Sequence, residues 1–278
     1  MNGIRMRFPG GRVRAFTMSY DDGVEQDARL IALMRKHGVK GTFNLNSGCY
    51  AAEGTVYPEG QIHRRMSLSA CKKLYTADDI EVAVHGYTHP FLDALPTGLR
   101  TLEVIRDREA LENDFGRIVR GAAYPYATYN DDTVACLKSC GIVYCRTAKS
   151  THSFALPENW LLLHPTCHHD DIELFDLAEK FMHDNYERSP LMFYLWGHAY
   201  EFEAHDNWDR IEKLLGIIGG QADIWYATNI QIYDYVKAFE SLQFSASGRR
   251  VFNPGCAPVW FYDGSVTHMV QSGEMYEF

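Results

Sequence analysis

Short apolar segments alternate with helix-like segments along most of this chain, and this alternation restricts the fold more than any other feature of the sequence. Short apolar runs predict strands, and apolar residues spaced three and four apart predict amphipathic helices. About eight strand-helix units follow one another between residues 13 and 242, without a sequence repeat. Such a pattern is typical of parallel strands joined by crossover helices, and this number of units favours a closed α/β barrel over a doubly wound open sheet.

The predicted elements leave two segments outside the alternation. The predicted strands are 13–19, 41–46, 81–84, 118–123, 142–145, 161–163, 191–196 and 224–227. The predicted helices are 30–37, 68–75, 98–115, 130–140, 171–185, 208–218 and 232–242. A long loop covers 47–66, and loops of that length are usually functional. From residue 243 the pattern changes to short β-like segments, so we expect a barrel domain over 1–242 and a β-rich tail over 243–278, packed on the same domain.

Polar side chains follow the predicted strands at the points where those strands end. These residues are Asp21, Asp22, His85, Tyr126, Arg146, His164 and His198. In parallel α/β folds, functional sites are built at the C-terminal ends of the strands. The sequence therefore predicts one polar site at this face of the barrel.

A divalent metal is expected in this site. His85 and His89 stand four residues apart, a spacing that brings two imidazoles together when the segment makes a helical turn. Neutral imidazole is the commonest metal ligand in proteins. Asp21-Asp22-Gly23 alone would read as a solvated turn, but its place at another strand end favours a shared site.

Composition excludes several classes of function. The net charge of −9 and the pI near 5.7 give no electrostatic reason to bind nucleic acid or an anionic membrane surface. The seven cysteines form no Cys-x-x-Cys pair, so reduced, mostly buried thiols are expected. No apolar run is long enough for a secretory signal or a membrane span, which predicts a cytoplasmic protein.

Four spaced motifs resemble those of the polysaccharide deacetylase family, the NodB homology domain of carbohydrate esterase family 4. Ser19-Tyr20-Asp21-Asp22-Gly23 matches its Thr-Phe-Asp-Asp-Gly motif, and His85-Gly86-Tyr87-Thr88-His89 keeps the two histidines of its His-(Ser/Thr)-x-x-His motif. Ala123-Tyr124-Pro125-Tyr126 stands where the family has Arg-x-Pro-Tyr, and Leu195-Trp196-Gly197-His198 resembles its last, Leu-x-His-like motif. The motifs keep the family's order, and the resemblance covers about residues 13–240 without the tail.

The resemblance implies a distorted, incomplete barrel of the (β/α)7 type. Together with the strand count and the pattern of the tail, it predicts a distorted (β/α)7-8 barrel with a small C-terminal β appendage. It implies one divalent metal, zinc before cobalt, nickel or manganese, held by Asp22, His85 and His89. By the same resemblance the catalytic residues are a general base, a general acid and a backbone N–H that stabilises the oxyanion. These are Asp21, His198 and Tyr126, respectively. Three protein ligands leave an open coordination position, as a hydrolytic metal requires.

The sequence departs from the family at two motifs. The arginine of the third motif is replaced by Ala123, and we expect Arg146, at the end of the next strand, to supply the guanidinium for Asp21. No fourth-motif Asp-Trp pair is present. One of the residues His164, His168, His169, Asp170 and Asp171 could orient His198, or Cys167 with the histidines could bind a second, adventitious metal.

These features predict metal-dependent hydrolysis of a non-peptide amide bond, with N-deacetylation of an N-acetylated sugar or short oligosaccharide as the leading hypothesis. The first alternative is a hydrolase of a ureide or cyclic amide, as in allantoinase-like members, because the third-motif arginine is absent. A non-catalytic carbohydrate-binding relative is the second alternative. The partner is a small-molecule or oligosaccharide substrate, with neither nucleic acid nor membrane, and a homo-oligomer remains open.

Overall fold

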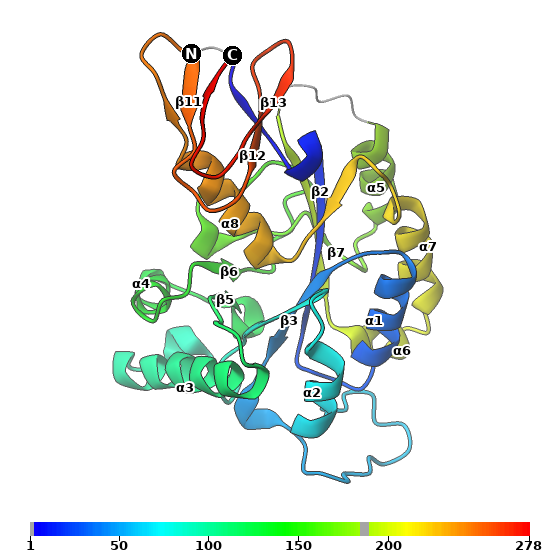
Figure 1. Ribbon diagram of the computed structural model, residues 1–278. Helices are drawn as coiled ribbons and strands as arrows, with labels where there is room; N and C mark the ends of the chain where they lie inside the picture. The colour runs from blue at the N-terminus through cyan, green and yellow to red at the C-terminus, as the bar shows by residue number, and fades with distance from the viewer. Residues whose placement is uncertain (1–2, 184–188) are drawn as a thin grey trace.

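The computed structural model describes residues 3–183 and 189–278. The strands of its parallel sheet are β2 (Arg14–Asp21), β3 (Gly41–Leu45), β4 (Ile80–Val84), β5 (Gly121–Ala123), β6 (Tyr144–Arg146), β7 (Cys167–His168), β8 (Leu191–Gly197) and β9 (Ile224–Tyr226). Its helices are α1 (Asp27–Lys36), α2 (Leu68–Tyr75), α3 (Thr97–Phe115), α4 (Asp131–Ser139), α5 (Leu174–His183), α6 (Ala199–Ala204), α7 (Trp208–Ile218) and α8 (Asn229–Glu240). The sheet curls in the order β6-β5-β4-β3-β2-β8-β7, with the helices packed around it (Figure 1). The predicted distorted (β/α) barrel is confirmed.

The central strand is β2, whose residues are buried after the first one. It pairs with β8 along most of its length, and with β3 over Ser19–Asp21. The short strand β9 pairs beside its first half, over Arg14–Phe16. Because both edges of β2 are paired up to its end, the backbone that carries Asp21 is fixed.

The segment that leads into β7 spans the opening between β6 and β8 in the curled sheet. Leu163 makes an isolated parallel bridge to Arg146 on β6, while His168 pairs with Trp196 on β8. The segment thereby contacts both margins of the sheet and brings the ends of β6 and β8 to the same mouth.

The predicted strand at 161–163 is wrong. Trp160–Leu162 form a 3-10 turn, because the side chain of Asn159 accepts a hydrogen bond from the Leu161 amide (3.0 Å) and caps that turn. The strand lies further on, at Cys167–His168.

The predicted helices are confirmed, with small shifts of their ends. Asn130 caps α4 as predicted, accepting from the Thr133 amide (2.9 Å). Helix α8 begins three residues earlier than predicted, because Thr228 forms a capping box with Gln231. The predicted end of α5 at residue 185 lies outside the described residues, and the six-residue helix α6 was not predicted.

The tail forms two small antiparallel sheets, as the predicted β appendage requires. Strand β1 (Arg5–Arg7) pairs with β12 (Val259–Tyr262), which pairs with β13 (Thr267–Val270). The other sheet is β10 (Gln243–Phe244), β11 (Arg250–Phe252) and β14 (Met275–Glu277). The start of the chain and the tail thus meet at one end of the molecule (Figure 1). A domain boundary at residue 242 stays a prediction.

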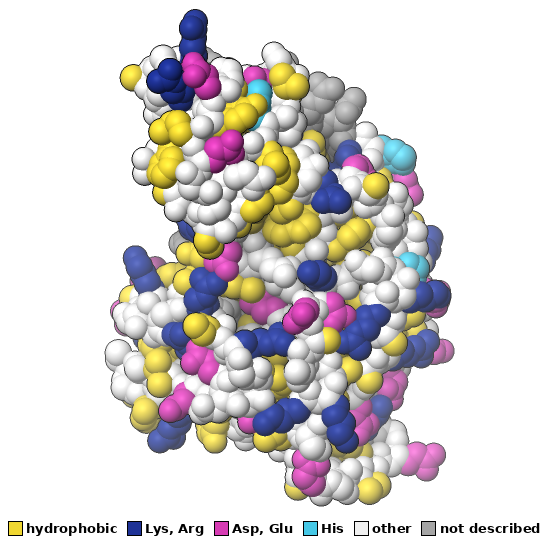
Figure 2. All heavy atoms as spheres, in the orientation of Figure 1, with side chains coloured by type: hydrophobic (Ala, Val, Ile, Leu, Met, Phe, Trp, Pro, Cys, Tyr) yellow, Lys and Arg dark blue, Asp and Glu magenta, His cyan; other side chains and the backbone are white. Residues whose placement is uncertain are grey.

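The face drawn in Figure 2 mixes Lys and Arg with Asp and Glu side chains, without an extended patch of one sign. Within residues 3–183 and 189–278, no helix has the length and apolar character needed to cross a membrane.

Candidate active site

A cavity of about 500 Å³ opens at the C-terminal ends of the barrel strands. Its lining residues are Asp21, Asp22, His63, Arg65, His85, His89, Tyr124, Tyr126, Ala127, Arg146, Trp196, His198 and Tyr200. Six of the seven strand-end residues that the sequence assigned to the site are among them, together with the predicted ligand His89, whereas His164 does not line the cavity. The strand-end rule therefore brought together side chains that are far apart along the chain.

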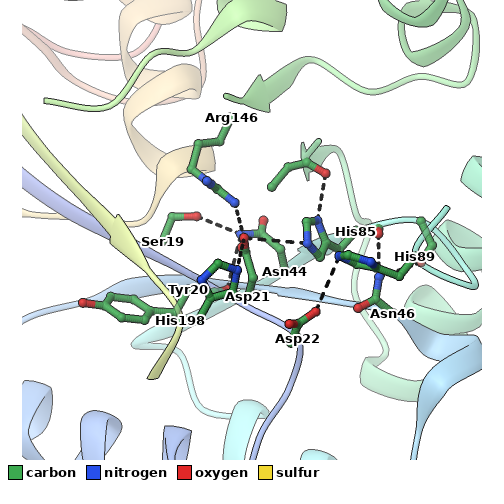
Figure 3. A network of polar contacts seen from close by, with 12 residues as sticks. Ser19, Tyr20, Asp21, Asp22, Asn44, Asn46, His85, His89, Arg146 and His198 are labelled. Carbon is green, nitrogen blue, oxygen red and sulfur yellow. Dashed lines mark hydrogen bonds and ion pairs between the residues drawn. The ribbon is translucent and has the colours of Figure 1, made fainter. Parts of the chain in front are cut away.

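Asp21 is a buried carboxylate with a guanidinium beside it (Figure 3). Arg146 donates from Nη2 to Oδ2 of Asp21, which is the contact expected from the sequence. Asn44 on β3 donates to Oδ1 (2.7 Å). Burial, the largest single effect, opposes ionisation of Asp21, but Arg146, His85 and His198 together outweigh burial and lower the pKa of the carboxyl below its ordinary value. Asp21 is therefore ionised at neutral pH and positioned to accept a proton.

Three candidate metal ligands lie next to this carboxylate. One ligand atom each of Asp22, His85 and His89 falls within a group whose atoms are all within 4.8 Å of one another. Figure 3 shows the two imidazoles turned toward the same point as Asp22. The carbonyl of Ala123 lies 3.0 Å from Nδ1 of His85, so Nδ1 carries the proton and the Nε2 lone pair is available to a metal.

The two imidazoles are in the form that binds a metal. Burial lowers the pKa of His85, and burial together with the His85 charge lowers the pKa of His89 to about 4. Both rings are neutral at neutral pH, which leaves each a nitrogen lone pair. Asp107 on α3 accepts from the His85 amide (3.0 Å) and so fixes the backbone at the end of β4.

Two residues of the long loop 47–66 contact Asp22, and the sequence analysis did not name them. Arg65 donates to Oδ1 (2.9 Å) and to the carbonyl (2.8 Å) of Asp22, and Nε2 of His63 lies 3.1 Å from Oδ2. Burial opposes the charge of Asp22, but these neighbours and His85 keep its pKa well below the usual range. The run of basic residues His63-Arg64-Arg65, late in a loop that was expected to be functional, was the available signal.

His198 lies across the cavity, 3.7 Å from Asp21 Oδ2 through its Nε2. It is the N-cap of α6, and its amide donates to Oε2 of Glu201 (2.9 Å). The same oxygen lies 3.3 Å from Nδ1 of His198. Burial alone would lower the pKa of His198, but Glu201 and Asp21 outweigh burial and raise it. Glu201 was not predicted from the sequence, although His198 and a glutamate three residues later have capping-box spacing.

Glu201 has a second imidazole partner. Nε2 of His168 lies 3.2 Å from Oε2 of Glu201. The amide of Asp170 donates to Nδ1 of His168 (3.1 Å), so the neutral ring carries its proton on Nε2 and directs it at the carboxylate. This proton position favours a hydrogen-bonded pair over a second metal at Nε2 of His168.

The other residues suggested for tuning His198 have different partners. His164 bonds to Thr147 through Nδ1 (2.6 Å), Asp170 pairs with His205 (2.8 Å), and Asp171 pairs with His152 (2.7 Å). His169 is buried and lies 3.4 Å from Glu201. Across the described parts of the chain, no group of potential metal ligands includes Cys167.

Backbone strain is concentrated around the cavity. Six non-glycine residues among those described have positive φ, and four of them line the cavity: Asp22, His89, Tyr126 and Ala127. Each such conformation costs about 1–3 kcal/mol unless its surroundings compensate. Strain of this kind clusters at functional sites, so its distribution independently marks the cavity.

Comparisons with known proteins agree with this geometry. The model of the polysaccharide deacetylase family matches residues 10–145. A putative polysaccharide deacetylase from Mycobacterium smegmatis superposes with a TM-score of 0.58 at 16% identity, over 85% of this chain and 94% of that one. The CE4 domain of a xylanase from the hindgut metagenome of Trinervitermes trinervoides gives 0.52 at 14% identity, over 81% and 92%.

A third structure, the deacetylase PplD of Streptococcus pyogenes, overlaps less. It has a TM-score of 0.45 and 18% identity over 52% of this chain, and this chain spans 61% of its length. No match was found among curated proteins.

The curled parallel sheet with its polar cavity at the strand ends is an α/β barrel fold, which the chain shares with the Mycobacterium smegmatis structure. Over residues 10–145, the chain resembles the polysaccharide deacetylase family.

Proposed function

We propose that this protein is a metal-dependent N-deacetylase of an N-acetylated sugar or short oligosaccharide. One observation carries the proposal: three neutral or anionic ligand groups converge beside a carboxylate that an arginine keeps ionised. An amide is hydrolysed when a water is deprotonated, the carbonyl is polarised and the leaving nitrogen is protonated. Each of these tasks has a candidate residue in the cavity.

The donor set suits a single divalent metal. One carboxylate and two imidazoles, from Asp22, His85 and His89, are the mixed oxygen and nitrogen ligands found in hydrolytic zinc sites. The lone pair of His85 Nε2 is directed into the site, because Nδ1 is engaged by Ala123. When bound there, a metal such as zinc, cobalt, nickel or manganese would supply Lewis-acid polarisation of the substrate.

Asp21 would take the proton of the attacking water. Its ionised form is stabilised by Arg146, and its buried position leaves Oδ2 within 3.7 Å of His85 Nε2 and of His198 Nε2. Water approaching the metal ligands would therefore meet the carboxylate.

His198 would protonate the departing amine. Nε2 faces Asp21 across the cavity, and the Glu201 carboxylate on the other side of the ring favours the imidazolium. The backbone N–H of Tyr126 would donate to the amide oxygen as negative charge develops on it. The positive φ of Tyr126 (54°) points to a specific demand on the backbone at this position.

The first test is elemental analysis of the purified protein, combined with acetate release from N-acetylglucosamine and its oligomers. We expect one bound metal and acetate release that a chelator abolishes and added zinc restores. Metal without acetate release, together with ring opening of hydantoin-like compounds, would favour a ureide or cyclic amide hydrolase. Sugar binding without any hydrolysis would favour a binding protein.

Two substitutions separate metal binding from acid catalysis. His85→Ala should lose the metal, whereas His198→Ala should keep it and lose about 10²- to 10⁴-fold in turnover. His183→Ala on α5, a largely exposed histidine, is the matched control and should change neither quantity. Full turnover in His198→Ala would reject this residue as the acid.

A further inference from the structure

Arg65, near the end of the long loop, contacts the candidate metal ligand Asp22 and a neighbouring asparagine at once. Nη2 of Arg65 donates to Oδ1 of Asp22 (2.9 Å), while Nη1 donates to the carbonyl of Asp22 (2.8 Å) and to Oδ1 of Asn46 (2.8 Å). The side chain of Arg65 is only 19% exposed. Within the described residues, all three of its hydrogen bonds therefore go to Asp22 or to Asn46, the residue that follows β3.

Asn46 continues this connection toward the histidine ligands. It is buried, and its Nδ2 donates to the carbonyls of His85 (2.5 Å) and Gly86 (2.8 Å) (Figure 3). Its side-chain oxygen faces the other way and accepts from Arg65. Arg65 and Asn46 thus form a link from Asp22, after β2, to the segment after β4 that carries both histidines.

The backbone of Arg65 is held in place independently of its side chain. Arg65 makes an isolated antiparallel bridge with Val24, and its carbonyl accepts from the hydroxyl of Tyr57 (2.6 Å). The amide of Met66 donates to the carbonyl of Gly23 (2.9 Å). The guanidinium therefore extends from a fixed backbone, and replacing the side chain should leave the loop in place.

The link holds Asp22 in a conformation that it would not adopt readily alone. Asp22 has φ of 80°, which is strained for a residue with a side chain. By bonding to both the carbonyl and the carboxylate, Arg65 fixes the backbone and the side chain of this one residue. Oδ1 lies 3.8 Å from Nε2 of His89 and keeps a lone pair for a metal, because a carboxylate oxygen accepts at two sites.

The charge of Arg65 by itself would weaken metal binding, because a guanidinium repels a cation. An arginine at this place therefore favours a metal only through the position that it gives to Asp22. Neither Arg65 nor Asn46 belongs to the four motifs that resemble the deacetylase family.

We infer that Arg65 and Asn46 are positioning residues that set the separation between Asp22 and the two histidines, and thereby the affinity of the site for a divalent metal. This inference rests on the proposed function, which places a metal between these ligands. Groups that hydrogen-bond to metal ligands typically change metal affinity by about 10- to 100-fold when they are removed.

The test measures the dissociation constant of Zn²⁺ and of Co²⁺ by competition with a chromophoric chelator, without substrate. Arg65→Met and Asn46→Ala should each raise this constant by about 10- to 100-fold. The double variant should bind little more weakly than either single variant, because both substitutions break the same link. Arg65→Lys keeps the charge but loses the planar fork that reaches two groups, so it should also bind more weakly than the wild type.

The adjacent arginine is the matched control. Arg64 has a similar exposure (21%), but it bonds to Glu25 (2.7 Å) and Glu203 (2.8 Å) instead of Asp22. Arg64→Met should leave the dissociation constant unchanged. The visible absorption spectrum of bound Co²⁺, which reports the geometry of its ligands, should change in Arg65→Met and stay as in the wild type in Arg64→Met.

Unchanged metal affinity in folded Arg65→Met would overturn the inference while leaving the proposed function intact. Tighter binding in this variant would also overturn it, because repulsion by the guanidinium would then outweigh its positioning of Asp22. If the wild type binds metal and the variants show the expected losses but no sugar releases acetate, the deacetylase proposal fails and the link stands. A wild-type protein that binds no metal would reject both.

Discussion

The charge of Asp21 depends on an arginine that the third motif does not supply. Ala123 occupies that position on β5, and Arg146 on β6 is its direct partner in the parallel pairing of the two strands. The two positions are therefore lateral neighbours at the mouth of the barrel. Arg146 stands one strand away from the position of the motif arginine, at the same register, and still reaches the carboxylate of Asp21. The site therefore has a guanidinium although Ala123 occupies the motif position.

Removal of Arg146 should shift the acid limb of the pH profile. As the proposed base, Asp21 would accept a proton only when ionised, so activity should fall as pH drops through its pKa. Arg146 lowers that pKa, and Arg146→Met should therefore move the acid limb of kcat/KM to higher pH. Arg146→Lys keeps a positive charge and should shift the limb less. An acid limb that stays in place in a folded Arg146→Met protein would show that another group sets it.

Substitution of Glu201 should shift the alkaline limb of the kcat/KM profile to lower pH. As the proposed acid, His198 would donate a proton only when charged, so activity should fall as pH rises through its pKa, which Glu201 raises. Glu201→Gln should lower the pKa of His198 and move the alkaline limb down by about 1 pH unit or more. Metal content should not change.

The neighbouring glutamate provides the control for this measurement. Glu203 lies on the same helix, but its partner is Arg64 of the long loop (2.8 Å). Glu203→Gln should leave the alkaline limb where it is. Equal shifts in both variants would mean that the charge of α6, rather than the contact with His198, determines the limb.

At the scale of elements, a buried carboxyl joins α1 to α2. Asp27 in the first turn of α1 is fully buried and accepts from the Tyr75 hydroxyl (2.6 Å) and the Val24 amide (3.1 Å). Burial outweighs these hydrogen bonds and raises the pKa of Asp27 to about 8. The helix pair is thus held by a carboxyl that is neutral over much of the physiological range.

This pKa predicts how stability depends on pH. Between the ordinary pKa of 3.8 and about 8, the folded state retains a proton that the unfolded state has lost, so stability falls as pH rises through this window. Asp27→Asn removes the titration. Measured by urea unfolding, the variant should gain stability relative to the wild type as pH rises from about 4 to about 8. A constant difference across that range would contradict the raised pKa.

The sequence predicted the elements that periodicity and strand ends define. Regular alternation determines that the strands are parallel, and parallel strands place their ends on one face. Asp21, His85, Arg146 and His198 could therefore be assigned to one cavity without knowledge of any contact.

Features that follow neither from periodicity nor from a position at a strand end could not be predicted. His63 and Arg65 reach Asp22 through a loop that has no periodicity, and only the path of its backbone brings them to the site. The turn before β7 is apolar like a strand, and one Asn159 cap decides its conformation. The pairing of β1 with β12 joins segments at opposite ends of the sequence, which no local pattern indicates.

At the scale of the whole molecule, one tyrosine connects the barrel, the first strand and the tail. The hydroxyl of Tyr235 on α8 donates to the carbonyl of Arg7 on β1 (2.6 Å) and accepts from the amide of Trp260 on β12 (2.9 Å). The β1-β12-β13 sheet is thereby fixed on the barrel through a helix as well as through its own pairing.

Tyr235→Phe should destabilise the protein by about 1–3 kcal/mol, because it removes a partner from two backbone groups at once. Urea unfolding measures this difference. Tyr233→Phe on the same helix is the control, since the described residues give its hydroxyl no hydrogen bond, and it should have a smaller effect. Equal losses would show that ring packing on α8, and not the hydroxyl, is responsible.

The pairing of β1 with β12 also has a consequence for biosynthesis. Strand β1 leaves the ribosome early, but its partner follows about 250 residues later, at roughly 5–20 residues per second. Met6 and Phe8, which are buried in the folded protein, lack the tail residues that cover them during that interval. A nascent chain stopped before residue 259 therefore cannot pair β1 with β12, so truncated translation products expose the apolar side chains around β1, by which chaperones and proteases can recognise them.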